Sequence, residues 1–300
     1  MTDISSEPPV IDQGGECDCA TAEEFLEKLN PLHRFWNGAP DSWVYRGLND
    51  TKHKLVAKAD RPGAYAPYTV LQGSMRFGMR DSVMQGLLDR FRECLDRAGL
   101  AIPAPPPTRR ANTISHSTIE HTDLPLMALA QHLGLPTQLL DWTTQARTAA
   151  YFAAEPAARS ADTHGRLAVW AIRRELDDDI GVQTGFWEGT TQQTRATLTF
   201  ESAPRASNPN LHAQSGLFTW LHGEKAHDLC LEDYVQLVQT QYEPSALNCP
   251  APLLRRLTAP QSCAPKLLRL LSYQGVDGAS MFPGHDGVVK AMKERPLWHK

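Results

Sequence analysis

Hydrophobic residues recur at helical spacing in several parts of the chain. The longest pattern runs from Ser74, a candidate N-cap, to about Ala98, and Gly99 ends it. A first helix should begin near Thr21, because Thr21 and Glu24 have the spacing of a capping box. Similar patterns predict helices over residues 123–132, 145–154 and 262–273, and a last short helix capped by Asp286.

Other segments are rich in β-branched and aromatic residues, which favour strands. They predict strands over residues 42–48, 165–172, 196–200 and 254–260. Between them, we expect a turn at 135–143 and a mobile or partner-facing loop at 176–195. Helices and strands mix without regular βαβ alternation, so we predict an α+β fold with a small mixed or antiparallel sheet packed by helices.

The N-terminal 20 residues are polar and rich in Ser, Pro, Gly and acids, which predicts a disordered tail. Residues 21–300 should then form one domain. The proline-rich stretch 102–110 should connect elements of that domain, because the segments on either side are too incomplete to fold alone.

Composition narrows the class of protein. The formal net charge is −4 and the basic residues are dispersed, which argues against general nucleic-acid binding. No apolar run is long enough for a membrane span, and the N-terminus does not resemble a secretory signal. The six cysteines have no metal-binding spacing, so we expect reduced thiols, no bound metal and a cytoplasmic location.

The stretch 129–154, LAQHLGLPTQLLDWTTQARTAAYFAA, is apolar enough for a core but carries many hydrogen-bonding side chains. A helix–turn–helix corner accounts for part of this polarity, with Asp141 and Thr143 as N-caps of the second helix. The remainder predicts a buried hydrogen-bond network or a site. The polar side chains concerned are Gln131, His132, Thr137, Gln138, Asp141, Trp142 and Thr143.

Several of these segments closely resemble the FRG domain, a family of bacteria and phages named for an aromatic–Arg–Gly motif. That motif is here Tyr45, Arg46 and Gly47. The other matching segments are LAQHLGLPTQLLDWT (129–143), AAYFA (149–153), NLHAQSGLF (210–218) and YQGVDGASMFPGHDGV (273–288). The resemblance covers roughly residues 20–295 and implies a family whose activity is open. One departure is Gln138, where the family usually has Arg; Arg147 could substitute for it in space.

Arg46 is the first candidate site residue. Its planar fork suits a phosphate or carboxylate, and Gly47 would let a ligand approach the backbone. The alternative is a structural ion pair with a carboxylate such as Asp141. His132 and Asp141 are in turn candidates for catalysis or for a purely structural network.

Further candidates would bind ligand rather than react with it. Tyr151 could form an aromatic platform or belong to the core, and Gln214 could contact an amide or base or simply shape a turn. The remaining ligand-binding candidates are Tyr45, Gln131, Thr137, Trp142 and Thr143.

Two functions follow. The layout is loosely similar to ADP-ribosyltransferases, in which case Arg46 would anchor NAD and a late glutamate, Glu201 or Glu224, would stabilise charge on the ribose. The alternative is a non-catalytic module of phage–host conflict that binds a small anionic ligand or a protein partner. Both require Arg46 and the 132–143 corner to converge on one cleft; otherwise the polar residues are architectural.

Overall fold

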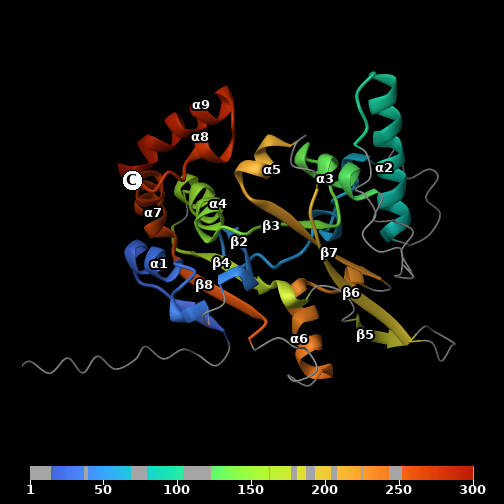
Figure 1. Ribbon diagram of the computed structural model, residues 1–300, viewed down its shortest axis with the longest axis horizontal. Helices are drawn as coiled ribbons and strands as arrows, with labels where there is room; N and C mark the ends of the chain where they lie inside the picture. Colours follow the sequence, from blue (N-terminus) through green and yellow to red (C-terminus); the bar gives the residue numbers. More distant parts are fainter. Residues whose placement is uncertain are drawn as a thin grey trace, which may run out of the picture.

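An eight-stranded sheet organises the chain (Figure 1). The computed structural model describes residues 15–36, 40–68, 80–103, 123–161, 163–176, 181–186, 193–203, 208–223, 226–242 and 252–299. Within these ranges the strands are β1 (Glu16–Asp18), β2 (Trp43–Leu48), β3 (Leu139–Thr143), β4 (Arg166–Arg173), β5 (Gly181–Phe186), β6 (Gln193–Glu201), β7 (Gly216–Gly223) and β8 (Leu254–Pro260).

Helices cover both faces of this sheet. They are α1 (Ala22–Lys28), α2 (Arg80–Arg97), α3 (Leu124–His132), α4 (Ala146–Arg159), α5 (Pro209–Ala213), α6 (Leu231–Gln241), α7 (Ala264–Tyr273), α8 (Gly278–Met281) and α9 (His285–Glu294). Short 3-10 helices occupy Arg34–Trp36, Pro40–Ser42, Lys58–Asp60, Arg174–Leu176, Ala226–Asp228, Gln261–Cys263 and Arg295–His299. In the described ranges, no helix combines the length and the apolar character needed to cross a bilayer.

The strand order is β1-β8-β4-β2-β3-β7-β6-β5, and only the β1–β8 pair is parallel. Strand β2 pairs with β4 along its whole length, whereas it meets β3 at one residue pair, Tyr45 with Thr143. Beyond that pair the two strands have no ladder. The sheet therefore has a seam between a β1-β8-β4-β2 half and a β3-β7-β6-β5 half.

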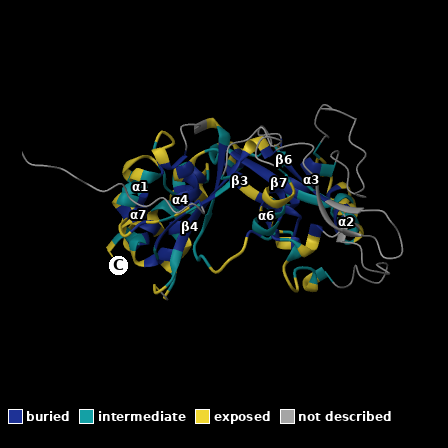
Figure 2. Cartoon of the chain, turned by 90° about the horizontal axis from the view of Figure 1, so that it is seen from below, coloured by how far each residue is buried: buried dark blue, intermediate teal, exposed yellow. Residues whose placement is uncertain are grey.

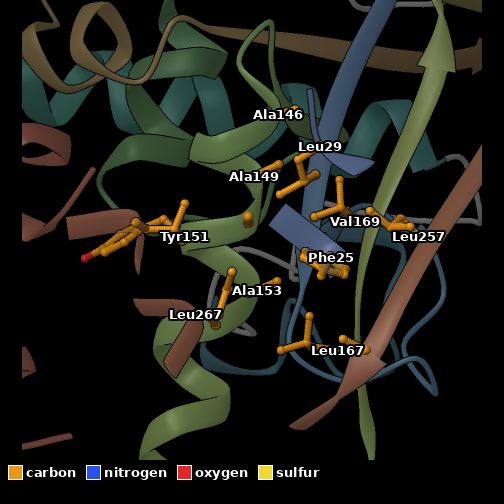
Figure 3. Packing of buried hydrophobic residues seen from close by; sticks show 14 of the residues in the cluster. Phe25, Leu29, Ala146, Ala149, Tyr151, Ala153, Leu167, Val169, Leu257 and Leu267 are labelled. Atoms are coloured by element: carbon orange, nitrogen blue, oxygen red, sulfur yellow. The ribbon is translucent and has the colours of Figure 1, made fainter. Parts of the chain in front are cut away.

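Three hydrophobic clusters fill the layers. On one face, α1, α4 and α7 pack over the first half of the sheet (Figure 3), and α2 and α3 pack over the second half. On the opposite face, α6 covers a cluster that spans both halves. Figure 2 shows buried positions along the sheet and the facing sides of the helices, with exposed positions outside. This arrangement confirms the predicted α+β fold.

Most predicted elements are confirmed, with boundaries shifted by a few residues. The helix expected from Ser74 is present from Arg80, and its earlier part lies outside the described residues. The proline-rich connector lies outside them from residue 104 onwards.

Five sequence predictions were wrong. Residues 139–143 form a strand in place of the expected turn. Leu139 and Leu140 enter hydrophobic clusters on opposite faces of the sheet, and two adjacent leucines show no apolar–polar alternation in the sequence. Asp141 therefore caps no helix, and α4 begins after Gln145. The expected loop at 176–195 contains β5, whose backbone pairs with β6. The predicted tail is too long, because Glu16–Asp18 pair with β8; residues 1–14 lie outside the described residues. Finally, α9 begins after Gly284, with Asp286 in its first turn.

Candidate functional site

Some polar residues of the central stretch meet Arg46 at the seam between β2 and β3. Arg46 Nη1 donates to the main-chain carbonyl of Asp141 at 2.5 Å and lies 3.6 Å from Oδ2 of the same residue. Because the β2–β3 ladder stops at Tyr45 and Thr143, this carbonyl receives a side-chain donor where a neighbouring strand would have supplied a backbone one. The Arg46 side chain is 16% exposed and that of Asp141 is 63% exposed, so the pair reaches the surface through its carboxylate.

Helix α3 completes this group. Gln131 Nε2 donates to Asp141 Oδ1 at 2.6 Å, and the side-chain oxygen Oε1 of Gln131 accepts from the Thr137 hydroxyl. These three residues and Arg46 form what we call the seam network. It fixes the Asp141 carboxylate from two sides, through Oδ1 by an amide and near Oδ2 by a guanidinium.

A second arginine, Arg61, contributes positive charge near Arg46. Burial lowers the pKa of the Arg46 guanidinium, the Asp141 carboxylate opposes that shift, and the neighbouring Arg61 adds to it. Arg61 donates to the carbonyl of Val56, and Lys58 Nζ donates to the carbonyl of Gly134 at 2.5 Å. Of these two exposed cations, Arg61 acts on Arg46, and Lys58 lies against the turn after α3. The segment is joined to the residues before β3 by the hydrogen bond from the Ala59 N–H to the Thr137 carbonyl.

Gln138, Trp142 and Thr143 are instead buried, and their side chains hold neighbouring elements together. Trp142 Nε1 donates to the Thr219 hydroxyl at 2.8 Å, and the Thr143 hydroxyl donates to the Gln214 carbonyl at 2.7 Å. Gln138 is 1% exposed, and its carbonyl accepts from Trp220 Nε1 at 3.1 Å. The departure from the family's usual Arg thus falls at a buried position, whereas Arg147 is exposed on α4.

In the aromatic–Arg–Gly motif, Tyr45 and Gly47 both face the side of the sheet that α4 covers. Tyr45 lies in the core, where its ring meets that of Trp36 edge-on at 5.2 Å. Gly47 lies under α4: a Cβ there would stand 1.9 Å from the Ala149 carbonyl oxygen. Glycine is therefore required at this position because helix α4 packs closely against it. The space next to Gly47 is filled by α4, so the ligand contact expected there is absent.

Two further candidates are engaged elsewhere. Tyr151 is buried and points away from the sheet toward the C-terminal helices (Figure 3), where its hydroxyl donates to Glu294. Gln214 ends α5, and its amide donates to the Met281 carbonyl at 3.1 Å. The structure brings neither side chain to the seam network.

His132 and Glu201 lie outside the seam network but on elements near it. His132 is exposed in the last turn of α3, and among the described residues no hydrogen bond or ion pair joins it to Arg46 or Asp141. Glu201 ends β6 opposite Phe218, and Phe218 is opposite Asp141 on β3. Directly opposed residues share a face, so the two carboxylates lie on one side of the sheet, roughly 10 Å apart at their Cα atoms. Glu224 lies outside the described residues.

A small cavity lies on the other side of β3, next to the 55–60 segment. Its volume is about 10 Å³, enough for one water molecule. Its polar lining comes from Asp60, Gln138 and Thr219. Arg46 and Asp141 do not line it, so a ligand of the seam network would bind at the surface.

Together, fold and site define an α+β protein whose split sheet is joined at its seam by an arginine and an exposed aspartate. Residues 41–162 match the family model of the FRG domain, and the chain therefore contains an FRG domain. The match includes β2 and β3, but their outer neighbours β4 and β7 lie beyond it, so the sheet is completed by the rest of the chain. No curated protein and no solved structure matches the chain.

Sequence reasoning missed the cations of the 56–61 segment and two buried arginines, Arg173 and Arg255. Lys58 and Arg61 lie in a segment for which no helix or strand was predicted. Arg173 follows one predicted strand and Arg255 lies in another, and a buried arginine in an apolar strand is itself a signal.

Proposed function

We propose that the FRG domain of this chain binds a ligand carrying a phosphorylated ribose, such as the ADP-ribose half of NAD. The observation that carries the proposal is the exposed Asp141 carboxylate held 3.6 Å from the Arg46 guanidinium. A carboxylate accepts hydrogen bonds from ribose hydroxyls, and an arginine fork suits phosphate. Arg61 adds positive charge near Arg46, where the phosphates would lie.

Binding of ADP-ribose to the full-length chain tests this proposal, by calorimetry and by the shift in Tm. Asp141→Asn should weaken binding by at least about tenfold, because a hydrogen bond to a charged group is lost. The main-chain carbonyl that accepts from Arg46 is retained in this variant, so the seam should stay closed. Asp96→Asn is the matched control, since Asp96 is an exposed aspartate on α2. Equal affinity of the Asp141 variant and the wild type, or no binding at millimolar ADP-ribose, overturns the proposal.

A second candidate is an NAD-consuming, ADP-ribosyltransferase-like enzyme. It is favoured by the position of Glu201 on the same sheet face as Asp141, with one strand between them. A carboxylate there could stabilise positive charge that develops on the ribose as nicotinamide leaves. Release of nicotinamide from NAD, lost in Glu201→Gln while NAD binding persists, would support the enzyme. If the protein binds NAD but leaves it intact after prolonged incubation, the enzyme is excluded and only the binding function remains.

A further inference from the structure

Two arginines are buried in the core on the face of the sheet that α4 covers. Arg173 ends β4 opposite Trp43 of β2, and its side chain is 1% exposed. Arg255 stands near the start of β8, opposite Ala171, and is 4% exposed. Arg173 and Arg255 are thus diagonal neighbours on adjacent strands, within reach of each other for long side chains.

Aromatic rings occupy the flat faces of both guanidinium groups. Arg173 lies over the ring of Trp43, 4.5 Å from its centroid, and Arg255 lies 4.8 Å from the centroid of Phe35 and 5.8 Å from that of Trp43. Such stacking uses the π-faces and leaves the N–H donors, which lie in the guanidinium plane, to be satisfied by other groups.

Four of those six in-plane nitrogen donors have no partner within the described part of the chain. Nε and Nη2 of Arg173 and Nε and Nη1 of Arg255 are buried without a hydrogen-bond partner. Among the described residues, the acid paired with them is Glu175, at 3.9 Å from Arg173 Nη1. Burial and the charge of Arg173 both lower the pKa of Arg255. Two buried cations with four free donor atoms are strongly unfavourable unless something supplies negative charge and acceptors.

We propose that a small tetrahedral oxyanion, of the size and charge of inorganic phosphate, binds between Arg173 and Arg255. Its oxygens would accept from the in-plane N–H groups of both forks, a geometry that oxyanions and guanidinium groups share. Glu175, whose side chain is 35% exposed, follows Arg173 by two residues, so this end of the strands lies close to solvent. This site is separate from the seam network and does not depend on the ribose ligand proposed above.

Thermal unfolding of the full-length chain in phosphate, with sodium chloride balancing the ionic strength, tests the proposal. Phosphate at about a hundred times its Kd should raise Tm by roughly 3–6 °C over chloride alone. Calorimetric titration with phosphate should give a single tight site. Acetate, which is planar and singly charged, should give a smaller shift.

Variants separate this site from general electrostatics. Arg255→Met should abolish the phosphate response, whereas Arg256→Met should retain it, because Arg256 points to the opposite face and pairs with Glu16 at 2.7 Å. Glu175→Gln should raise the affinity, since it removes a competing carboxylate. If Arg255→Met does not fold, Arg255→Lys, which keeps the charge but loses the fork, should weaken binding at least about tenfold.

Equal Tm values in phosphate and chloride overturn the proposal, and so does a response that persists in the Arg255 variants. A response lost equally in Arg256→Met would assign it to net charge. Asp141→Asn should leave the phosphate response unchanged. A response that grows in that variant, where Arg46 has lost a competing carboxylate, belongs to the seam network and also overturns this inference.

Discussion

The Tyr151 hydroxyl lies 2.5 Å from Oε1 of Glu294, and this hydrogen bond ties helix α4, near the end of the FRG match, to α9. The other carboxylate oxygen of Glu294 accepts from the Gly278 N–H at 3.1 Å. Burial, and then the bond to Glu294, raise the pKa of Tyr151, so its hydroxyl remains a donor. Helices α4, α8 and α9 therefore share one buried polar contact.

Removal of the Tyr151 hydroxyl should destabilise the protein. Tyr151→Phe leaves a buried carboxylate short of one donor, and we expect a loss of about 1–3 kcal/mol in the free energy of unfolding, measured in urea. The matched control is Tyr45→Phe, because the Tyr45 hydroxyl is buried without a partner. That variant should be neutral or stabilising. Equal losses in the two variants would contradict the role given to Glu294.

The same contact predicts a pH dependence. Burial raises the pKa of Glu294 above that of an unfolded chain, with the bonds from Tyr151 and Gly278 opposing the shift. The folded state therefore binds this proton more tightly, and the group favours folding below its unfolded pKa, a contribution lost as pH rises through the folded value. Glu294→Gln resembles the protonated form. Its stability relative to the wild type should be greatest near pH 7 and should decline as pH falls toward about 4.

Urea unfolding of both proteins between pH 7.5 and 4 measures that difference. Glu27→Gln, which removes an exposed carboxylate from α1, controls for the change in net charge. A difference between Glu294→Gln and the wild type that does not vary with pH would show that the carboxylate does not titrate as its burial requires.

Gly47 should tolerate no side chain. The Cβ of Gly47→Ala would stand 1.9 Å from the Ala149 carbonyl oxygen and 2.7 Å from the Ala153 nitrogen, both backbone atoms of α4. The helix would have to move off β2, and we expect a loss of roughly 3 kcal/mol or more. Gly63→Ala is the control: Gly63 has a φ of +75° but open space around it, so strain alone should cost about 1 kcal/mol. Thermal or urea unfolding of the two variants compares steric and conformational effects.

Helices and strands were predictable from the sequence where hydrophobic side chains recur with a single helical or strand period. The strands at β2, β4 and β8 and the helix α3 carry uniform patterns, and their boundaries were close to those observed. β3 was missed because its five residues enter different clusters, so no single face is apolar along it. β5 depends on backbone pairing with β6, which leaves little trace in side-chain hydrophobicity.

The site was predictable only in part. The surplus of polar residues correctly indicated a network, and the pairing of Arg46 with Asp141 was among the alternatives. The division of that network into a surface part and a buried part was not predictable, because it depends on the seam. A single residue pair joins β2 to β3, and no local pattern specifies where a ladder stops.

Gln138 provides a test of the buried part. Its carbonyl accepts from Trp220 Nε1 at 3.1 Å, so Gln138→Met should strand a buried donor and cost about 1–3 kcal/mol in unfolding free energy. Trp220→Phe removes that donor. The double variant should then lose less unfolding free energy than the sum of the losses of the two single variants. Urea unfolding of the four proteins gives the coupling energy, expected between about 0.5 and 3 kcal/mol. Strict additivity would mean that Gln138 and Trp220 do not depend on each other, and the position that distinguishes this chain from its family would then have no structural role through that bond.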